Sequence, residues 1–108
     1  MNLHKDIELH GHRGARGLWP ENSIYGFLKA IELGVDVLEL DVVVAGNKEI
    51  LVSHDPFFNP LICLDPNGNE IGAEDDYNIY RMTYSEIKKF DCGSKFHPGY
   101  PTQENCDR

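Results

Sequence analysis

The chain has 108 residues, with 10 Lys and Arg residues against 18 Asp and Glu residues and a formal charge of −8 at pH 7. A composition of 41% hydrophobic and 26% charged residues is typical of one globular domain, and no apolar run approaches the roughly 20 residues that would span a bilayer. The acidic charge argues against a nucleic-acid partner and against residence on an anionic membrane, so a phosphate substrate would need locally positive groups.

The first part of the chain predicts a strand followed by a helix. Residues 7–10 are typical of a short strand, and the glycines at positions 11 and 14 predict a tight turn after it. Helix-start signals occupy residues 19–23 and precede an apolar stripe with helical spacing, Ile24, Phe27, Leu28 and Ile31. Gly34 predicts a left-handed cap at the end of this helix.

Residues 35–44 predict a second strand, buried on both faces as in a parallel sheet covered by helices. Strand, helix and strand at this spacing indicate a βαβ unit and an α/β fold. Gly46-Asn47 then predicts a two-residue hairpin leading to an antiparallel strand over 49–53.

Residues 57–81 are irregular and read as a loop-rich surface insertion, with a small hairpin around Asn67-Gly68. A turn explains residues 65–69 better than a calcium loop, because Glu70 stands where an EF-hand needs glycine. Thr83 and Glu86 form a capping box for a short helix, and the chain is loop-like beyond residue 93.

The three cysteines, Cys63, Cys92 and Cys106, are widely spaced and odd in number. Such a pattern suits neither a disulfide framework nor a zinc site, so we expect ordinary thiols.

Two carboxylates, Glu39 and Asp41, interrupt the apolar strand. Residues i and i+2 of a strand point to one side, about 6–7 Å apart. Burying two like charges without a partner is costly, and a divalent cation such as Mg²⁺ or Ca²⁺ would offset them. The alternative is a pair of exposed or arginine-paired carboxylates on an edge strand.

The predicted hairpin also places His54. With Gly46-Asn47 as the loop, Ala45 faces Lys48 and Glu39 faces His54, so the imidazole lies beside the two carboxylates. A register slip of one residue would turn His54 away, and an exposed loop histidine is the alternative.

His12 and Arg13 follow the first strand, where α/β folds usually bind ligands. Arg13 can direct two hydrogen bonds to a phosphate, and two imidazoles beside a metal suit phosphodiester cleavage by proton transfer. The sequence leaves several other roles open, either site or packing: Glu21, Asp55, Tyr77, Tyr80 and Tyr84.

The motifs resemble the start of the glycerophosphodiester phosphodiesterase family: His12-Arg13-Gly14, Pro20-Glu21-Asn22, the run from Gly34 to Val42, and His54-Asp55-Pro56. The resemblance implies an α/β fold, the amino-terminal portion of a TIM-type (β/α)8 barrel with a loop-rich insertion after the third strand. It also implies metal-dependent hydrolysis of glycerophosphodiesters to glycerol 3-phosphate and an alcohol.

Carried over position by position, the resemblance makes His12 and His54 the acid/base pair and Arg13 the phosphate-binding residue. Glu39 and Asp41 would be ligands of Ca²⁺ or Mg²⁺. The alternatives are a phospholipase C- or D-like enzyme on the same scaffold and a non-catalytic barrel fragment.

The length of 108 residues is short for a barrel of about 200–250 residues, so we expect an incomplete barrel domain that is inactive alone. Its core motifs lie in 7–56, its insertion in about 57–82 and a short helix in about 84–90. No signal peptide is visible, which favours the cytoplasm, with the periplasm or secretion as the alternative if the chain is processed.

Overall fold

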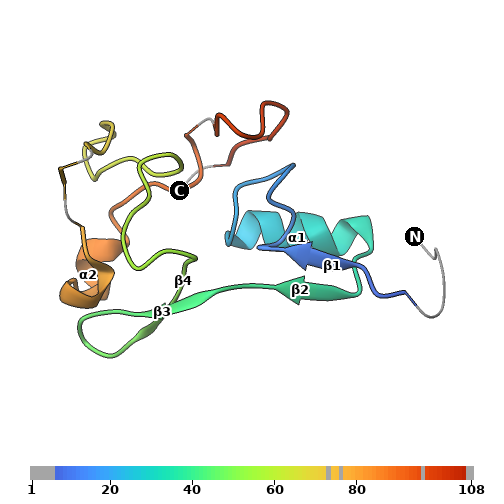
Figure 1. Ribbon diagram of the computed structural model, residues 1–108, viewed down its shortest axis with the longest axis horizontal. Coiled ribbons are helices and arrows are strands. Elements are labelled where there is room, and N and C mark those ends of the chain that lie inside the picture. Colours follow the sequence, from blue (N-terminus) through green and yellow to red (C-terminus); the bar gives the residue numbers. More distant parts are fainter. Residues whose placement is uncertain (1–6, 73, 76, 96, 107–108) are drawn as a thin grey trace.

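The computed structural model describes residues 7–72, 74–75, 77–95 and 97–106. The elements in chain order are β1 (His10–His12), α1 (Ile24–Leu33), β2 (Val37–Glu39), β3 (Val42–Val44), β4 (Ile50–Val52), the 3-10 helix η1 (Ile79–Arg81) and α2 (Tyr84–Ile87). Figure 1 shows β1, β2 and α1 at one end of the elongated molecule and the β3–β4 hairpin with α2 at the other.

The predicted βαβ unit is confirmed. β1 and β2 pair in parallel, with His10, Gly11 and His12 opposite Val37, Leu38 and Glu39. Between them, α1 begins at Ser23, whose side chain accepts the Gly26 N–H, and ends at Gly34 with a φ of 92°. Both helix ends therefore follow from local capping chemistry.

The apolar stripe of α1 does not face the sheet. Ile24, Leu28 and Ile31 are 79%, 57% and 56% exposed, whereas the buried residues of the helix are Gly26 and Ala30. A Cβ on Gly11 would stand 2.1 Å from the Gly14 carbonyl oxygen and 3.6 Å from the Ala30 Cβ. Small residues thus let β1, its following turn and α1 approach one another closely, while Ile24, Leu28 and Ile31 point outward and Phe27 is half-buried beside Gly14.

The long strand predicted over 35–44 is wrong in two respects. It breaks between Glu39 and Val42, so β2 pairs with β1 while β3 pairs with β4 in a separate two-stranded sheet. It is also not buried on both faces, since Val42 and Val44 are 57% and 45% exposed. Val43 packs against the core instead, giving the alternation of a half-buried antiparallel strand.

The hairpin register also differs from the prediction by one residue. Val42 pairs with Val52 and Val44 with Ile50, and the Ala45 N–H donates to the Glu49 carbonyl over 2.8 Å. The loop therefore has three residues, 46–48, and Lys48 adopts a φ of 68°. Three-residue hairpin loops commonly end in such a left-handed residue, which moves every later pairing by one position.

The hydrophobic core lies mainly in the segment that the sequence indicated as a surface insertion. Its buried members come from the end of β3, the insertion and α2: Ala45, Phe58, Cys63, Ile71, Ile79, Ile87 and Phe90. Phe58 and Phe90 stack with ring centroids 3.9 Å apart, and the Tyr77 ring meets Phe90 edge-on at 4.9 Å. Phe58, Cys63, Ile71 and Ile79 follow no helical or strand period, so the pattern of the sequence did not reveal them.

Cys63 and Cys92 form a disulfide, so the expectation of three ordinary thiols is wrong. Leu64 and Asp91 form an antiparallel bridge with backbone hydrogen bonds of 2.7 and 3.1 Å in the two directions. This bridge sets Cys63 opposite Cys92 with Cα atoms 4.1 Å apart, and a separation of 29 residues hides the pair in the sequence. Cys106 takes no part in this disulfide.

The smaller predicted features are confirmed. Thr83 and Glu86 form the capping box of α2, although this helix spans 84–87 rather than 84–90. Around Gly68 the chain makes a small hairpin, with Leu64 bridged to Glu70. Among the described residues, no helix has the length and apolar character needed to cross a membrane.

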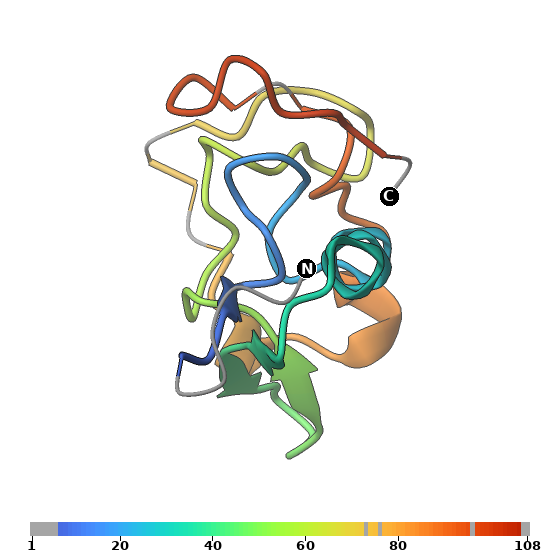
Figure 2. The same ribbon diagram turned by 90° about the vertical axis from the view of Figure 1, so that its right-hand side faces the viewer.

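The last described segment, 97–106, lies over the loop that precedes α1 (Figure 2). The Gln103 side-chain amide donates to the carbonyls of Arg16 and Trp19 over 2.7 and 3.0 Å. The Tyr25 hydroxyl donates to Glu104 over 2.9 Å, and this hydrogen bond raises the pKa of Tyr25 above its ordinary value of 10.0. The segment thereby fixes both the loop and the first turn of α1.

Candidate active site

The carboxyl ends of β1 and β2 bring His12 and Glu39 together. They are the last residues of two parallel strands and are partners in the ladder. The His12 Nε2 lies 3.8 Å from the Glu39 Oε1, and side-chain exposures of 61% and 37% leave both groups accessible. Ligands of parallel α/β sheets bind outside this edge, so the candidate site is built from here.

Arg13, the next residue, adopts a backbone conformation that few side chains tolerate. Its φ is 54°, and that of Asn22 is 52°. The Asn22 N–H donates to the Arg13 carbonyl over 2.8 Å, and the Arg13 N–H donates to the Glu39 carboxylate over 3.0 Å. Backbone strain of about 1–3 kcal/mol per residue gathers at functional sites, which marks this loop as part of one.

The Arg13 guanidinium is held in place by two carboxylates. Its Nη1 donates to Glu21 over 2.9 Å, and its Nε lies 3.5 Å from Asp41. Glu21 also contacts Arg16 over 3.4 Å, and the Asn22 amide donates to Asp41 over 3.2 Å. Side-chain exposures of 7% for Glu21 and 11% for Arg13 show that the pair is nearly buried. Glu21, whose role the sequence left open, therefore orients Arg13.

Glu39 and Asp41 both contact Arg13, although they do not lie on one continuous strand as predicted. Glu39 accepts a hydrogen bond from the Arg13 backbone N–H, whereas Asp41 forms an ion pair with the guanidinium without a hydrogen bond to Nε. Together with Glu21, these carboxylates face two guanidinium groups, which leaves one excess negative charge, −3 + 2 = −1. A bound anion would be repelled unless a cation shared the site.

The donor set fits a hard divalent cation. Within the part of the chain that is described, no three His, Cys, Asp or Glu side chains form a group that could enclose a metal ion. Mg²⁺ commonly takes one or two carboxylates from the protein and its remaining oxygens from water and phosphate. Asn22 lies beside Asp41, and its Oδ1 is buried without a hydrogen-bond partner. This amide oxygen is a further possible ligand next to the carboxylates that face Arg13.

His54 does not lie opposite Glu39, so the predicted pairing of these two residues is wrong. The β3–β4 ladder ends at Val42 and Val52, and the next hydrogen bond runs from the Ser53 N–H to the Asp41 carbonyl over 2.9 Å. His54 follows directly, with 43% of its side chain exposed and its Nδ1 3.1 Å from Asp55. His54 is therefore held near Asp41 by the backbone hydrogen bond of its neighbour Ser53, and not by pairing within the β3–β4 ladder.

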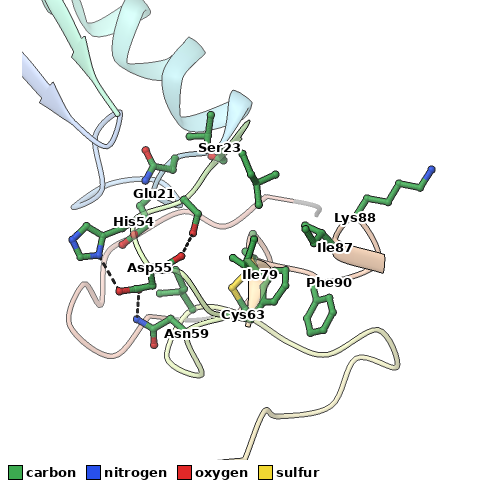
Figure 3. A pocket seen from close by; sticks show the side chains of 18 of the residues that line it. Glu21, Ser23, His54, Asp55, Asn59, Cys63, Ile79, Ile87, Lys88 and Phe90 are labelled. Atoms are coloured by element: carbon green, nitrogen blue, oxygen red, sulfur yellow. Dashed lines mark hydrogen bonds and ion pairs between the residues drawn. A yellow bond between two sulfur atoms is a disulfide. The ribbon is translucent and has the colours of Figure 1, made fainter. Parts of the chain in front are cut away.

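A cavity of about 530 Å³ lies between His54 and the residues Glu21 and Asn22, which contact Arg13 and Asp41. Glu21, Asn22 and Ser23 line it together with His54 and Asp55. Figure 3 shows Glu21, His54 and Asp55 at one side of the cavity and Ile79, Ile87 and Phe90 at the other. The polar side could hold a charged group and the apolar side an aliphatic or aromatic one.

Sequence reasoning missed several residues that shape this site. Arg16, Asn22 and Asn59 carry contacts to Glu21, Asp41 and Asp55. Pro20-Glu21-Asn22 was visible as a motif, but no local pattern signals Asn59. Of the tyrosines left open, Tyr84 lines the cavity, Tyr77 packs in the core, and Tyr80 is 64% exposed.

Comparison with known proteins places this chain in a family. Residues 12–106 match the glycerophosphoryl diester phosphodiesterase family. A glycerophosphodiester phosphodiesterase of Caldanaerobacter subterraneus subsp. tengcongensis is 39% identical over 85 residues, which cover 79% of this chain and 30% of that protein. The chain thus spans about a third of the length of the curated relatives it matches.

Solved structures agree. A Silicibacter pomeroyi protein assigned to the glycerophosphoryl diester phosphodiesterases superposes with a TM-score of 0.86 at 30% identity, covering 94% of this chain and 35% of that one. The glycerophosphodiester phosphodiesterase of Thermotoga maritima superposes with a TM-score of 0.62 at 32% identity, covering 80% and 34%. These neighbours are TIM-barrel enzymes, and the chain matches a part of that fold.

Proposed function

The chain belongs to the glycerophosphoryl diester phosphodiesterase family, and from that membership we propose that it supplies part of the active site of a metal-dependent phosphodiesterase. The enzyme hydrolyses small glycerophosphodiesters to glycerol 3-phosphate and an alcohol. Residues 7–56 form opening β/α units of its barrel, and the segment after them forms an insertion beside the site. The activity is proposed for the complete barrel, because the chain spans about a third of its relatives.

One observation carries this proposal. His12, Arg13 and Glu39 meet where the parallel strands β1 and β2 end, and Arg13 is fixed by carboxylates on both sides. A guanidinium has five N–H donors in a rigid fork, so Arg13 keeps donors for phosphoryl oxygens after binding Glu21. The site is therefore suited to hold a phosphate group against an accessible imidazole.

In this proposal, the two histidines move the protons. One imidazole accepts the proton of the attacking oxygen, and the other gives a proton to the departing alcohol oxygen. His12, 61% exposed beside Glu39, and His54, at the cavity wall, are the two candidates.

Glu39 and Asp41 would hold a Ca²⁺ or Mg²⁺ ion. Such an ion polarises phosphoryl oxygens and offsets their charge when it is bound. The carboxylates around Arg13 and Arg16 exceed the two guanidinium groups by one negative charge, which supports this assignment. A bound divalent cation would change the net charge of this group from −1 to +1. The net field would then attract the anionic substrate that it otherwise repels.

A chimera tests the proposal. Residues 7–106 would replace the matching third of the Caldanaerobacter relative, and release of glycerol 3-phosphate from glycerophosphocholine would be followed with Mg²⁺ or Ca²⁺ present. We expect turnover by the chimera, and we expect His12→Ala and His54→Ala each to reduce kcat at least about 100-fold, as for a lost acid or base.

The unaltered relative and a chimera with His97→Ala serve as controls, since His97 is not among the proposed catalytic groups. A folded chimera without turnover, or normal turnover in either histidine variant, contradicts the proposal. A preference for lysophosphatidylcholine over glycerophosphocholine in a parallel assay would show that the substrate is a lipid phosphodiester rather than a small glycerophosphodiester.

A further inference from the structure

We propose that Asn59 is a positioning residue that, through Asp55, fixes the orientation and tautomer of the His54 imidazole. The inference rests on the proposed proton-transfer role of His54. It concerns the hydrogen-bond chain from His54 through Asp55 to Asn59 along the cavity wall, which does not include Arg13.

The chain runs through three side chains. His54 Nδ1 lies 3.1 Å from Asp55 Oδ1, and Asp55 Oδ2 accepts a hydrogen bond of 3.2 Å from Asn59 Nδ2. Figure 3 shows Asp55 between the other two, linked to both. With both carboxylate oxygens engaged, Asp55 presents an acceptor to Nδ1, so the imidazole proton resides on Nδ1 and Nε2 is left to exchange protons.

The amide of Asn59 has a single orientation that satisfies its neighbours. Its Oδ1 accepts the Leu61 N–H over 2.9 Å, and only the other end, Nδ2, is then available to Asp55. The Asn59 carbonyl accepts the N–H groups of Ile62 and Cys63 over 3.1 and 3.0 Å. Cys63 is nearly buried and is joined to Cys92, so the donor comes from a well-anchored turn.

The Asp55 backbone is fixed as well. The Ser53 hydroxyl donates to the Asp55 carbonyl over 2.8 Å, and the Ile79 N–H donates to the Pro56 carbonyl over 2.9 Å. The remaining freedom of Asp55 lies in its side-chain torsions, which the bond from Asn59 restrains. Loss of this bond should therefore free the carboxylate to leave the histidine for solvent.

Asp55→Asn gives a specific prediction. Because Nδ2 of Asn59 needs an acceptor, the new amide turns its oxygen to Asn59 and its NH₂ group to His54. Nδ1 must then accept, so the imidazole proton moves to Nε2. In Asp55→Asn combined with Asn59→Ala, nothing dictates the amide orientation, and the tautomers mix. A purely structural Asn59 would not produce this difference between the single and the double variant.

The test is nitrogen NMR of the imidazoles in the ¹⁵N-labelled 108-residue chain at about pH 8.5, where an ordinary imidazole is neutral. Loss of signals in His54→Gln assigns His54. We expect the Nδ1–H form in the wild type and a change in the tautomer ratio of about tenfold or more in Asp55→Asn. Asn59→Ala and Asn59→Asp should both move the ratio toward a mixture, the latter while keeping the acceptor for the Leu61 N–H.

Asn47→Ala is the matched control, because it removes an amide–carboxylate bond of 2.9 Å, to Glu49, in the hairpin loop. An Nε2–H form in the wild type, or equal spectra for Asp55→Asn and the double variant, overturns the proposal. The NMR result does not depend on turnover, so failure of the phosphodiesterase assay and failure of this inference are separate outcomes.

Discussion

Glu21 is the residue on which the two arginines of the site depend. It contacts Arg13 and Arg16 with only 7% of its side chain exposed. In Glu21→Gln, two poorly hydrated guanidinium groups would lose their common anion, and breaking such a pair costs about 3 kcal/mol. We expect a lower urea midpoint at unchanged slope. Glu32→Gln, at a side chain 70% exposed and paired with Lys29, is the control and should change stability little. Equal effects of the two substitutions would contradict the orienting role of Glu21.

Glu39 and Asp41 lead to a prediction about metal ions. A ligand that binds the folded state stabilises it, by about 2.7 kcal/mol at 100 times its Kd. We expect Mg²⁺ or Ca²⁺ to raise the unfolding temperature of the wild-type chain and to have no effect on Glu39→Gln/Asp41→Asn. Asp65→Asn, in the turn that resembles a calcium loop, should leave the ion effect intact. If the ion still raises the unfolding temperature of the double variant, or no longer raises that of Asp65→Asn, the ion binds elsewhere.

The site residues differ in how far the sequence could place them. His12, Arg13 and Glu39 lie at the ends of two strands joined by one helix, and short-range signals suffice to bring such ends together. His54 could not be placed in this way, because the left-handed conformation of Lys48 lengthens the hairpin loop and shifts the register. Asn59 could not be predicted, because it contacts Asp55 four residues away within an irregular segment that has no helical or strand period.

At the scale of elements, the capping box of α2 predicts a pH dependence. The Thr83 backbone N–H and then its hydroxyl donate to Glu86, and these hydrogen bonds lower the pKa of the Glu86 carboxyl from 4.5. A lowered pKa means that the folded state favours the carboxylate. The stabilisation is therefore full above pH 4.5 and is lost as the pH falls through the folded-state pKa.

NMR titration of the Glu86 carboxyl tests this effect. In Thr83→Ala, the pKa of Glu86 should return partway toward 4.5, because the hydroxyl bond is lost while the backbone donor remains. Ser85→Ala, in the same turn but outside the capping box, should leave the titration unchanged. If Glu86 titrates at its ordinary value in the wild type, the capping box does not persist in solution.

The elements also show why it is easier to predict from sequence that a segment is a helix than to predict which face of the helix is buried. The helical period over 24–31 identified α1 correctly, and the caps at Ser23 and Gly34 fixed its ends. The same period indicated an amphipathic helix, yet the buried residues are Gly26, against the Pro20 carbonyl, and Ala30, beside Gly11 of β1. Close packing against β1 selects small residues, and this selection outweighs the hydrophobic stripe.

At the scale of the whole molecule, the Cys63–Cys92 disulfide joins the insertion to the segment after α2 and supports the core around Phe58 and Phe90. Closing a loop of this length stabilises a fold by about 3–4 kcal/mol in the chain-entropy estimate. We expect Cys63→Ser/Cys92→Ser to lower the free energy of unfolding accordingly. A reducing agent should destabilise the wild type but not this variant, and Cys106→Ser is the matched control. Stability that is equal with and without reductant would show that the disulfide does not form.

Much apolar surface of the molecule lies outside this core. Ile24, Leu28 and Ile31 on α1 and Val42, Val44 and Ile50 on the hairpin are all at least 45% exposed. The sequence predicted Val42 and Val44 in a strand buried on both faces, and the chain matches about a third of the length of the neighbouring barrels. Within the described part of the chain, these apolar side chains remain largely uncovered.

Asn22 combines a left-handed backbone with a buried, unpartnered oxygen, and its amide nonetheless binds Asp41. Glycine at this position would relieve both penalties and forfeit the contact. Selection for thermal stability alone should therefore favour glycine at position 22. The selected proteins would be more stable but less active, because the contact with Asp41 would be missing.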